Sequence, residues 1–122
     1  EDLRDETLII YPVEHDRLDI FNHFLEPADI EPAQVRTSEL TVMMMQLVAS
    51  GRGVCCLPNW ALHEYNSKGY VSARRLGEKG VFSTLYAAVR TDMLDAAFMQ
   101  DFLLTAKDTS FTTLAGVSAV KD

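Results

Sequence analysis

Residues 37–58 read TSELTVMMMQLVASGRGVCCLP, and this stretch predicts a helix, a tight turn and a buried strand. The spacing i, i+3, i+4, i+7, i+8 of an amphipathic helix is followed by Leu40, Met43, Met44, Leu47 and Val48. Thr37 or Ser38 is a suitable helix N-cap, and Gly51 suits the left-handed backbone that ends many helices. Residues 53–57 form an apolar run of strand length, which ends at Pro58.

Short apolar runs and helical patterns alternate on both sides of this stretch. Strands are predicted over residues 8–11, 33–37, 53–57, 70–76 and 82–89. Helices are predicted between the N-cap Asp16 and Pro27, over residues 38–50 and 60–66, and from the N-cap Asp95 to about Lys107, with a turn over residues 77–80. This order of elements predicts an α/β domain with a mostly parallel sheet and flanking helices.

Length and composition set the function classes that remain. The chain has 122 residues, 48% of them hydrophobic and 24% charged, which excludes general disorder. Its net charge of −7 disfavours contact with DNA or an acidic membrane. No apolar run approaches the roughly 18–20 residues that cross a bilayer. The acidic start at Glu1, without Met, predicts a fragment or processed chain with no secretory signal.

The helix predicted over residues 38–50 is more apolar than one buried face requires. Between Leu40 and Ser50, the only polar side chains are Thr41, Gln46 and Ser50 itself. A second covered face is therefore implied. A chain of this length has little material to wrap a helix completely, so we favour contact with a protein partner over full burial within the chain.

Two patterns resemble cofactor or metal sites, but their context is unsuitable. Gly51 and Gly53 follow a helix and open a strand, whereas a dinucleotide-binding loop follows a strand and opens a helix. Glu14, His15 and His23 are potential metal ligands, but the two histidines lie eight residues apart and no second cluster completes a four-ligand site. No metal and no cofactor is predicted.

Cys55 and Cys56 are adjacent, and a disulfide between neighbours is strained, so both are expected to be reduced. Reduced cysteines favour a reducing compartment. Strand alternation sends the two thiols to opposite apolar faces, where burial makes a thiol unreactive. A nucleophile–base pair with His63, in a small α/β enzyme, remains an alternative. Nothing in the sequence argues positively for an enzyme, so no catalytic residue is predicted.

A ligand site is predicted from the architecture. In open α/β sheets, ligands bind beyond the carboxyl ends of strands, against helix N-termini. Residues 11–13, 36–39 and 57–60 occupy such ends. Thr37 and Ser38 offer hydroxyl groups there, and Glu39 suits an ammonium group, although helix capping alone also accounts for the hydroxyl residues.

Residues 45–58, MQLVASGRGVCCLP, resemble the helix, Gly-x-Gly turn, strand and Leu-Pro ending of the effector-binding domain of LysR-type transcriptional regulators. The stretches DLRDETLIIYP (residues 2–12), LPNW (57–60) and LYAAVR (85–90) resemble most closely the family members that activate methionine biosynthesis, whose co-effector is homocysteine. The resemblance implies a partial effector-binding domain over residues 1–107. Residues 108–122 show no periodicity, which predicts a loosely ordered C-terminal tail.

The resemblance also implies an architecture and partners. The chain corresponds to the second subdomain of a type 2 periplasmic-binding-protein-like fold, and residues 82–107 would pack on a first subdomain that this sequence lacks. The implied protein is a cytoplasmic regulator, without contact to membranes. It forms dimers or tetramers and contacts DNA only through an N-terminal domain that is also missing here. Half of a periplasmic solute-binding protein, which shares the fold, is the alternative.

Finally, the resemblance assigns residues to two surfaces. The positions that match the effector cleft are Pro12, Thr37, Ser38, Glu39, Thr41 and Pro58. Those that match the dimer interface are Met43, Met44, Gln46, Leu47 and Ser50.

Overall fold

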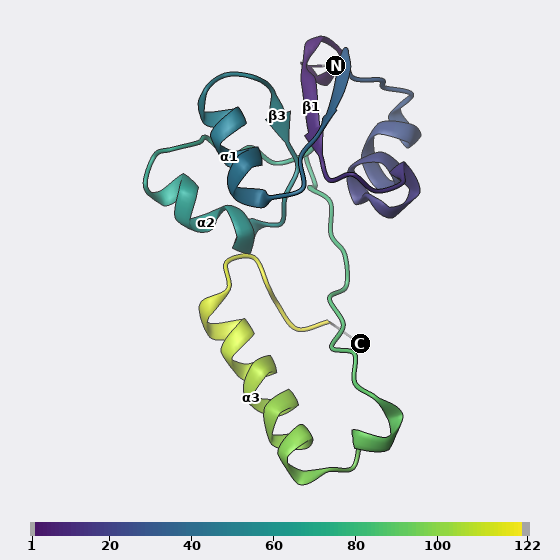
Figure 1. Ribbon diagram of the computed structural model, residues 1–122, viewed down its shortest axis with the longest axis vertical. Coiled ribbons are helices and arrows are strands. Elements are labelled where there is room, and N and C mark those ends of the chain that lie inside the picture. Colours follow the sequence, from purple (N-terminus) through teal and green to yellow (C-terminus); the bar gives the residue numbers. More distant parts are fainter. Residues whose placement is uncertain (1, 121–122) are drawn as a thin grey trace. The chain divides into compact units, whose positions relative to one another are not determined.

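In the computed structural model, which describes residues 2–120, Thr7–Ile10 forms strand β1 at the centre of a three-stranded sheet (Figure 1). Gln34–Thr37 forms β2 and Val54–Cys55 forms β3, and both pair with β1 in parallel, in the order β2-β1-β3. The predicted α/β class and parallel sheet are therefore confirmed. Strand β3 is shorter than the run predicted over residues 53–57.

Successive side chains of β1 point to opposite faces of the sheet, and each face carries its own apolar core. Ile9 is 0% exposed and packs with Met44 and Met45 on one face. The core on the other face comprises Leu8, Ile10, Ile20, Phe21 and Leu25. Because both faces are covered, residues 8–10 form a continuous apolar run rather than an alternating one.

Helical segments cover the two faces (Figure 1). Helix α1, Thr41–Ala49, and helix α2, Asn59–Ser67, contribute to the core around Ile9, α2 through Leu62 and Tyr65. The other face is covered by the 3-10 turn His15–Arg17 and by a continuous helical segment over residues 19–28, which includes the π-helix Phe21–Leu25 and the 3-10 turn Glu26–Ala28.

The helix predicted between Asp16 and Pro27 is present over residues 19–28, but its predicted N-cap is wrong and most of it has π or 3-10 geometry. Leu18 has extended backbone angles, and Asp16 lies inside the first turn instead of capping a helix. The wider π turn presents Phe21 and Leu25 to the same core as Ile20, which lies five residues before Leu25.

Helix α1 begins later than predicted. Its N-cap is Leu40, in extended conformation, so the predicted capping by Thr37 or Ser38 is wrong. The predicted stop at Gly51 is confirmed, because Gly51 has a φ of 71° and its N–H donates to the carbonyl of Val48 at 2.9 Å. Gly69, with a φ of 73°, ends α2 in the same way.

The predicted buried stripe of α1 is also wrong in part. Met44 and Met45 are each 1% exposed, whereas Leu40 is 63% and Met43 is 49% exposed. The face that packs on the sheet follows Thr41, Met44, Met45 and Val48, which is the same spacing shifted by one residue.

Two compact units make up the described residues. The first contains the residues up to Leu57 and Leu62–Phe82, and the second contains Pro58–Ala61 and the residues from Ser83 onward. The strands predicted over residues 70–76 and 82–89 are wrong, because no strand within residues 2–120 pairs with either stretch. The predicted turn is confirmed over residues 77–79.

The second unit contains helix α3, Ala97–Thr113. Its N-cap is Ala96 rather than the predicted Asp95, and the helix continues past the predicted end at Lys107. Residues 114–120 form neither helix nor strand, and residues 121–122 of the tail predicted to be loosely ordered lie outside the described residues. Within the described part of the chain, no helix is long and apolar enough to cross a membrane.

Replacing Gly53 by Ala should destabilise the first unit strongly. Gly53 has a φ of 147°, and an added Cβ would lie 2.4 Å from the carbonyl oxygen of Thr7, a backbone atom of the central strand. We expect a loss of at least about 2 kcal/mol in the free energy of unfolding, measured by urea denaturation.

Gly51→Ala is the matched control, because Gly51 also has a positive φ but its Cβ would meet no atom within 4 Å. It should cost only about 1 kcal/mol. Equal losses for the two variants would contradict the close approach of Gly53 to β1.

Candidate functional site

Strands β1 and β2 end beside each other at one edge of the sheet, and α1 begins after that edge. Ile10 pairs with Thr37 in register, and the N–H of Ser38 donates to the carbonyl of Ile10 at 2.9 Å. Two residues later, Leu40 precedes the first turn of α1. The structure therefore brings Thr37, Ser38 and the helix N-terminus to the carboxyl ends of two parallel strands.

The first turn of α1 has unused hydrogen-bond donors. The earliest helical bond that closes on the N-cap runs from the N–H of Met44 to the carbonyl of Leu40, at 3.0 Å. The N–H groups of Thr41, Val42 and Met43 therefore have no carbonyl acceptor inside the helix. The aliphatic side chain of Leu40 has no acceptor atom. Free N–H groups and the positive end of the helix dipole together suit a carboxylate or another anion.

Polar side chains surround this helix end. Thr37 and Glu39 are exposed and Ser38 is half-buried, with its hydroxyl donating over a long 3.4 Å to the carbonyl of Leu40. Thr41 is half-buried, and its Oγ1 lies 2.5 Å from the hydroxyl oxygen of Tyr11. Tyr11 lies in one of the predicted ligand-binding strand ends, residues 11–13, but it was not among the residues matched to the effector cleft.

The two prolines predicted for the effector site, Pro12 and Pro58, lie in different compact units. Pro12 is exposed and follows Tyr11, so the chain places it beyond the end of β1. Pro58 is exposed as well, but it belongs to the second unit. The four predicted residues that the structure groups at the start of α1 are Thr37, Ser38, Glu39 and Thr41.

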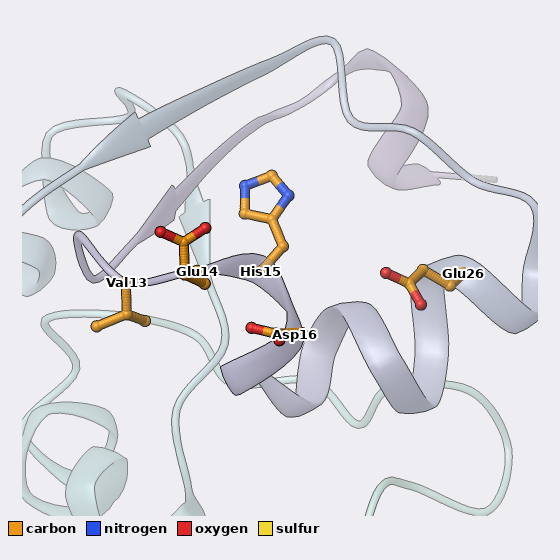
Figure 2. A pocket seen from close by; sticks show the side chains of 5 residues that line it. All are labelled: Val13, Glu14, His15, Asp16 and Glu26. Atoms are coloured by element: carbon orange, nitrogen blue, oxygen red, sulfur yellow. The ribbon is translucent and has the colours of Figure 1, made fainter.

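An open depression of about 560 Å³ follows β1 in the chain, and it is lined by Val13, Glu14, His15, Asp16 and Glu26 (Figure 2). The imidazole of His15 is stacked on the ring of Phe21, with centroids 4.0 Å apart. In the part of the chain that the structure describes, no group of three His, Cys, Asp or Glu side chains could hold a metal ion.

Cys55 and Cys56 are free thiols that point to opposite faces of the sheet, as strand alternation predicts. Cys55 packs against the core around Ile9, and Cys56 packs against the core around Leu8. Desolvation by burial, and to a smaller extent the charge of the neighbouring Cys56, raise the pKa of Cys55 from 9.0 to about 11. Desolvation by burial, and to a smaller extent the negative charge of Asp19, also raise the pKa of Cys56. Both thiols are therefore protonated at neutral pH, which disfavours the enzyme alternative.

Four of the five residues predicted for a dimer interface are at least partly accessible on the surface of α1, and one is buried. Met43, Gln46 and Ser50 are exposed and Leu47 is half-buried. Met44 must be removed from the set, because its side chain is 1% exposed and packs on β1 inside the chain. Leu40 and Val42, at 63% and 57% exposure, extend the apolar surface of α1.

The chain resembles one family of bacterial proteins throughout its length. A sequence model described as the LysR substrate binding domain matches residues 1–110. The HTH-type transcriptional regulator MetR of Haemophilus influenzae is 45% identical over 120 residues, which cover 98% of this chain and 38% of that protein. The regulator of the same name in Escherichia coli is 39% identical over 108 residues, covering 88% and 33%. The chain thus spans less than half the length of these relatives.

A solved structure gives the same result. The regulatory domain of MetR, a LysR family regulator from N. meningitidis, superposes with a TM-score of 0.84 at 41% sequence identity. The match covers 98% of this chain and 55% of that domain. A cysteine-to-serine mutant of that domain matches with a TM-score of 0.83 at 40% identity.

Labelling of the two cysteines should be slow in the folded protein. With the pKa of Cys55 at about 11, the thiolate fraction at pH 7 falls well below that of an ordinary thiol with a pKa of 9.0. Iodoacetamide labelling, followed by mass spectrometry, should accelerate at least tenfold when urea unfolds the chain. It should also accelerate as the pH rises from 9 towards 11. Rapid labelling of a single cysteine in the folded protein would restore the enzyme alternative.

Proposed function

The chain belongs to the LysR substrate-binding domain family, and we propose that it senses the effector of a transcriptional regulator that controls methionine biosynthesis, with homocysteine as the effector. The observation that carries this proposal is the group of Thr37, Ser38 and Glu39 at the start of α1, where two parallel strands end. All the relatives described above are transcriptional regulators, which disfavours the solute-binding alternative.

The chemistry of this edge fits an α-amino acid. Its carboxylate accepts hydrogen bonds from the free N–H groups of the first turn of α1 and from the hydroxyls of Thr37, Ser38 and Thr41. Its ammonium group pairs with the exposed carboxylate of Glu39. Pro12, which the chain places directly beyond the end of β1, contacts the apolar part of the ligand. The chain itself performs no reaction and needs no cofactor.

The proposed domain is larger than this chain. Residues 1–107 form the second half of a type 2 periplasmic-binding-protein-like fold, and the other half belongs to a part of the protein outside this sequence. Large exposed apolar side chains in the second unit support a missing partner surface, namely Leu85, Tyr86, Phe98 and Phe102. The net charge of −7 makes this chain repel phosphate groups, so we assign the DNA contact to an N-terminal domain outside this sequence. The regulator is proposed to act in the cytoplasm.

Helix α1 couples the effector to assembly of the protein. Its first turn binds the effector, and its exposed residues Met43, Gln46 and Ser50, with the half-buried Leu47, contact a second subunit in a dimer or tetramer. A shift of α1 on effector binding therefore changes the subunit contact. Coupling between two such sites is typically worth about 1–3 kcal/mol.

Thr37→Val should weaken the response to homocysteine without unfolding the protein. The substitution keeps the shape of an exposed side chain but removes a hydroxyl that binds the effector carboxylate. Loss of one hydrogen bond to a charged group predicts about a tenfold higher homocysteine concentration for half-maximal activation of a reporter gene.

Thr112→Val replaces another exposed threonine, which lies in the second unit, and should leave the response unchanged. The thermal unfolding midpoint of both variants should match that of the native protein. A normal homocysteine response in Thr37→Val would exclude this threonine from the effector site.

Met43→Glu should weaken subunit association at least tenfold, because burying an unpaired carboxylate in an apolar interface costs several kcal/mol. Sedimentation equilibrium of the full-length protein measures this dissociation constant. Val13→Glu adds the same charge at another exposed apolar position, 42% exposed against 49% for Met43, and should leave association unchanged. If Met43→Glu and Val13→Glu both have the dissociation constant of the native protein, this face of α1 is excluded from the interface.

A further inference from the structure

Tyr11 connects the central strand with the first turn of α1. It follows Ile10, the last residue of β1, and its half-buried ring packs on the apolar core formed by Ile9, Met44 and Met45. The hydroxyl at the far end of the ring reaches Thr41, the first residue of α1, with an oxygen–oxygen distance of 2.5 Å. Packing holds the ring, so the position of the hydroxyl is fixed by the sheet and not by a mobile loop.

The direction of this hydrogen bond follows from the acidity of the two groups. A phenolic O–H is a much stronger acid than an aliphatic one, so the hydroxyl of Tyr11 is the better donor and that of Thr41 is the better acceptor. When Tyr11 donates, the proton of Thr41 Oγ1 stays available for another acceptor. The hydroxyl of Thr41 then adds to the donors of the first helical turn.

We propose that Tyr11 is a positioning residue, which orients and polarises the Thr41 hydroxyl so that Thr41 donates to the carboxylate of an amino-acid effector. This inference rests on the proposed effector site. A chain of two hydroxyl donors strengthens the terminal hydrogen bond, because each donor polarises the next. Tyr11 itself makes no contact with the effector, so its contribution passes entirely through Thr41.

A double-mutant cycle separates this role from a purely structural one. The full-length native protein, Tyr11→Phe, Thr41→Val and the double variant are titrated with L-homocysteine by calorimetry under reducing conditions. Tyr11→Phe keeps the packed ring and should weaken homocysteine binding about fivefold, the value of a typical hydrogen bond. In the presence of Thr41→Val, the Tyr11→Phe change should produce no further loss.

Tyr65→Phe is the matched control. Tyr65 is half-buried and packs on the same core from α2, so this variant removes a phenolic hydroxyl without removing a bond to Thr41. Its homocysteine affinity should equal that of the native protein. The thermal unfolding midpoint of every variant is measured first.

The outcomes distinguish this inference from the proposed function. If the native protein binds homocysteine and Tyr11→Phe binds it equally well, the role of Tyr11 is wrong and the effector proposal stands. Affinity losses that add in the double variant, or a Tyr11→Phe protein that does not fold, also overturn the positioning role. If the native protein does not bind homocysteine, the proposed effector and this inference both fail.

Discussion

The burial of β1 on both faces is the constraint from which the candidate site follows. Ile9 fills the core under α1, while Leu8 and Ile10 fill the core on the opposite face, so β1 must lie between two layers of helices. Parallel neighbours on each side require crossover connections, and each connection leaves the sheet at the same edge. The polar residues that follow β1 and β2 are gathered at that edge as a consequence.

Helix α1 presents three different surfaces, and the proposed function uses each of them. Met44 and Met45 attach it to the sheet, its first turn offers free N–H groups at the site, and its exposed side carries Leu40, Val42 and Met43. If α1 contacts the effector and a second subunit as proposed, a rigid helix would transmit a small displacement from one contact to the other. The proposed coupling between effector binding and subunit contact therefore needs no change in the fold.

The sequence predicted the elements whose causes are local. The apolar run at residues 8–11 predicted β1, the stretch after Pro32 predicted β2, and Gly51 predicted the end of α1. The strand pattern of Cys55 and Cys56 predicted their opposite faces. The strand predicted over residues 82–89 failed because a strand depends on a partner, which residues 2–120 do not supply. The Tyr11–Thr41 contact was missed because 30 residues separate the two side chains, and only the parallel sheet brings them together. The family resemblance was confirmed, although it placed the buried Met44 in an interface.

Electrostatics narrows the class of ligand that this edge accepts. The net charge of −7 repels anions from the chain as a whole, so a phosphate or a dicarboxylate meets an unfavourable field before it reaches α1. An amino acid is a zwitterion at neutral pH and has no net charge to repel. In the proposed site, its carboxylate would lie close to the N–H groups of α1, where local dipoles outweigh the distant charges. The acidic surroundings, including Glu39, would favour its ammonium group. This charge distribution therefore supports the proposal of a neutral amino-acid effector over an acidic metabolite.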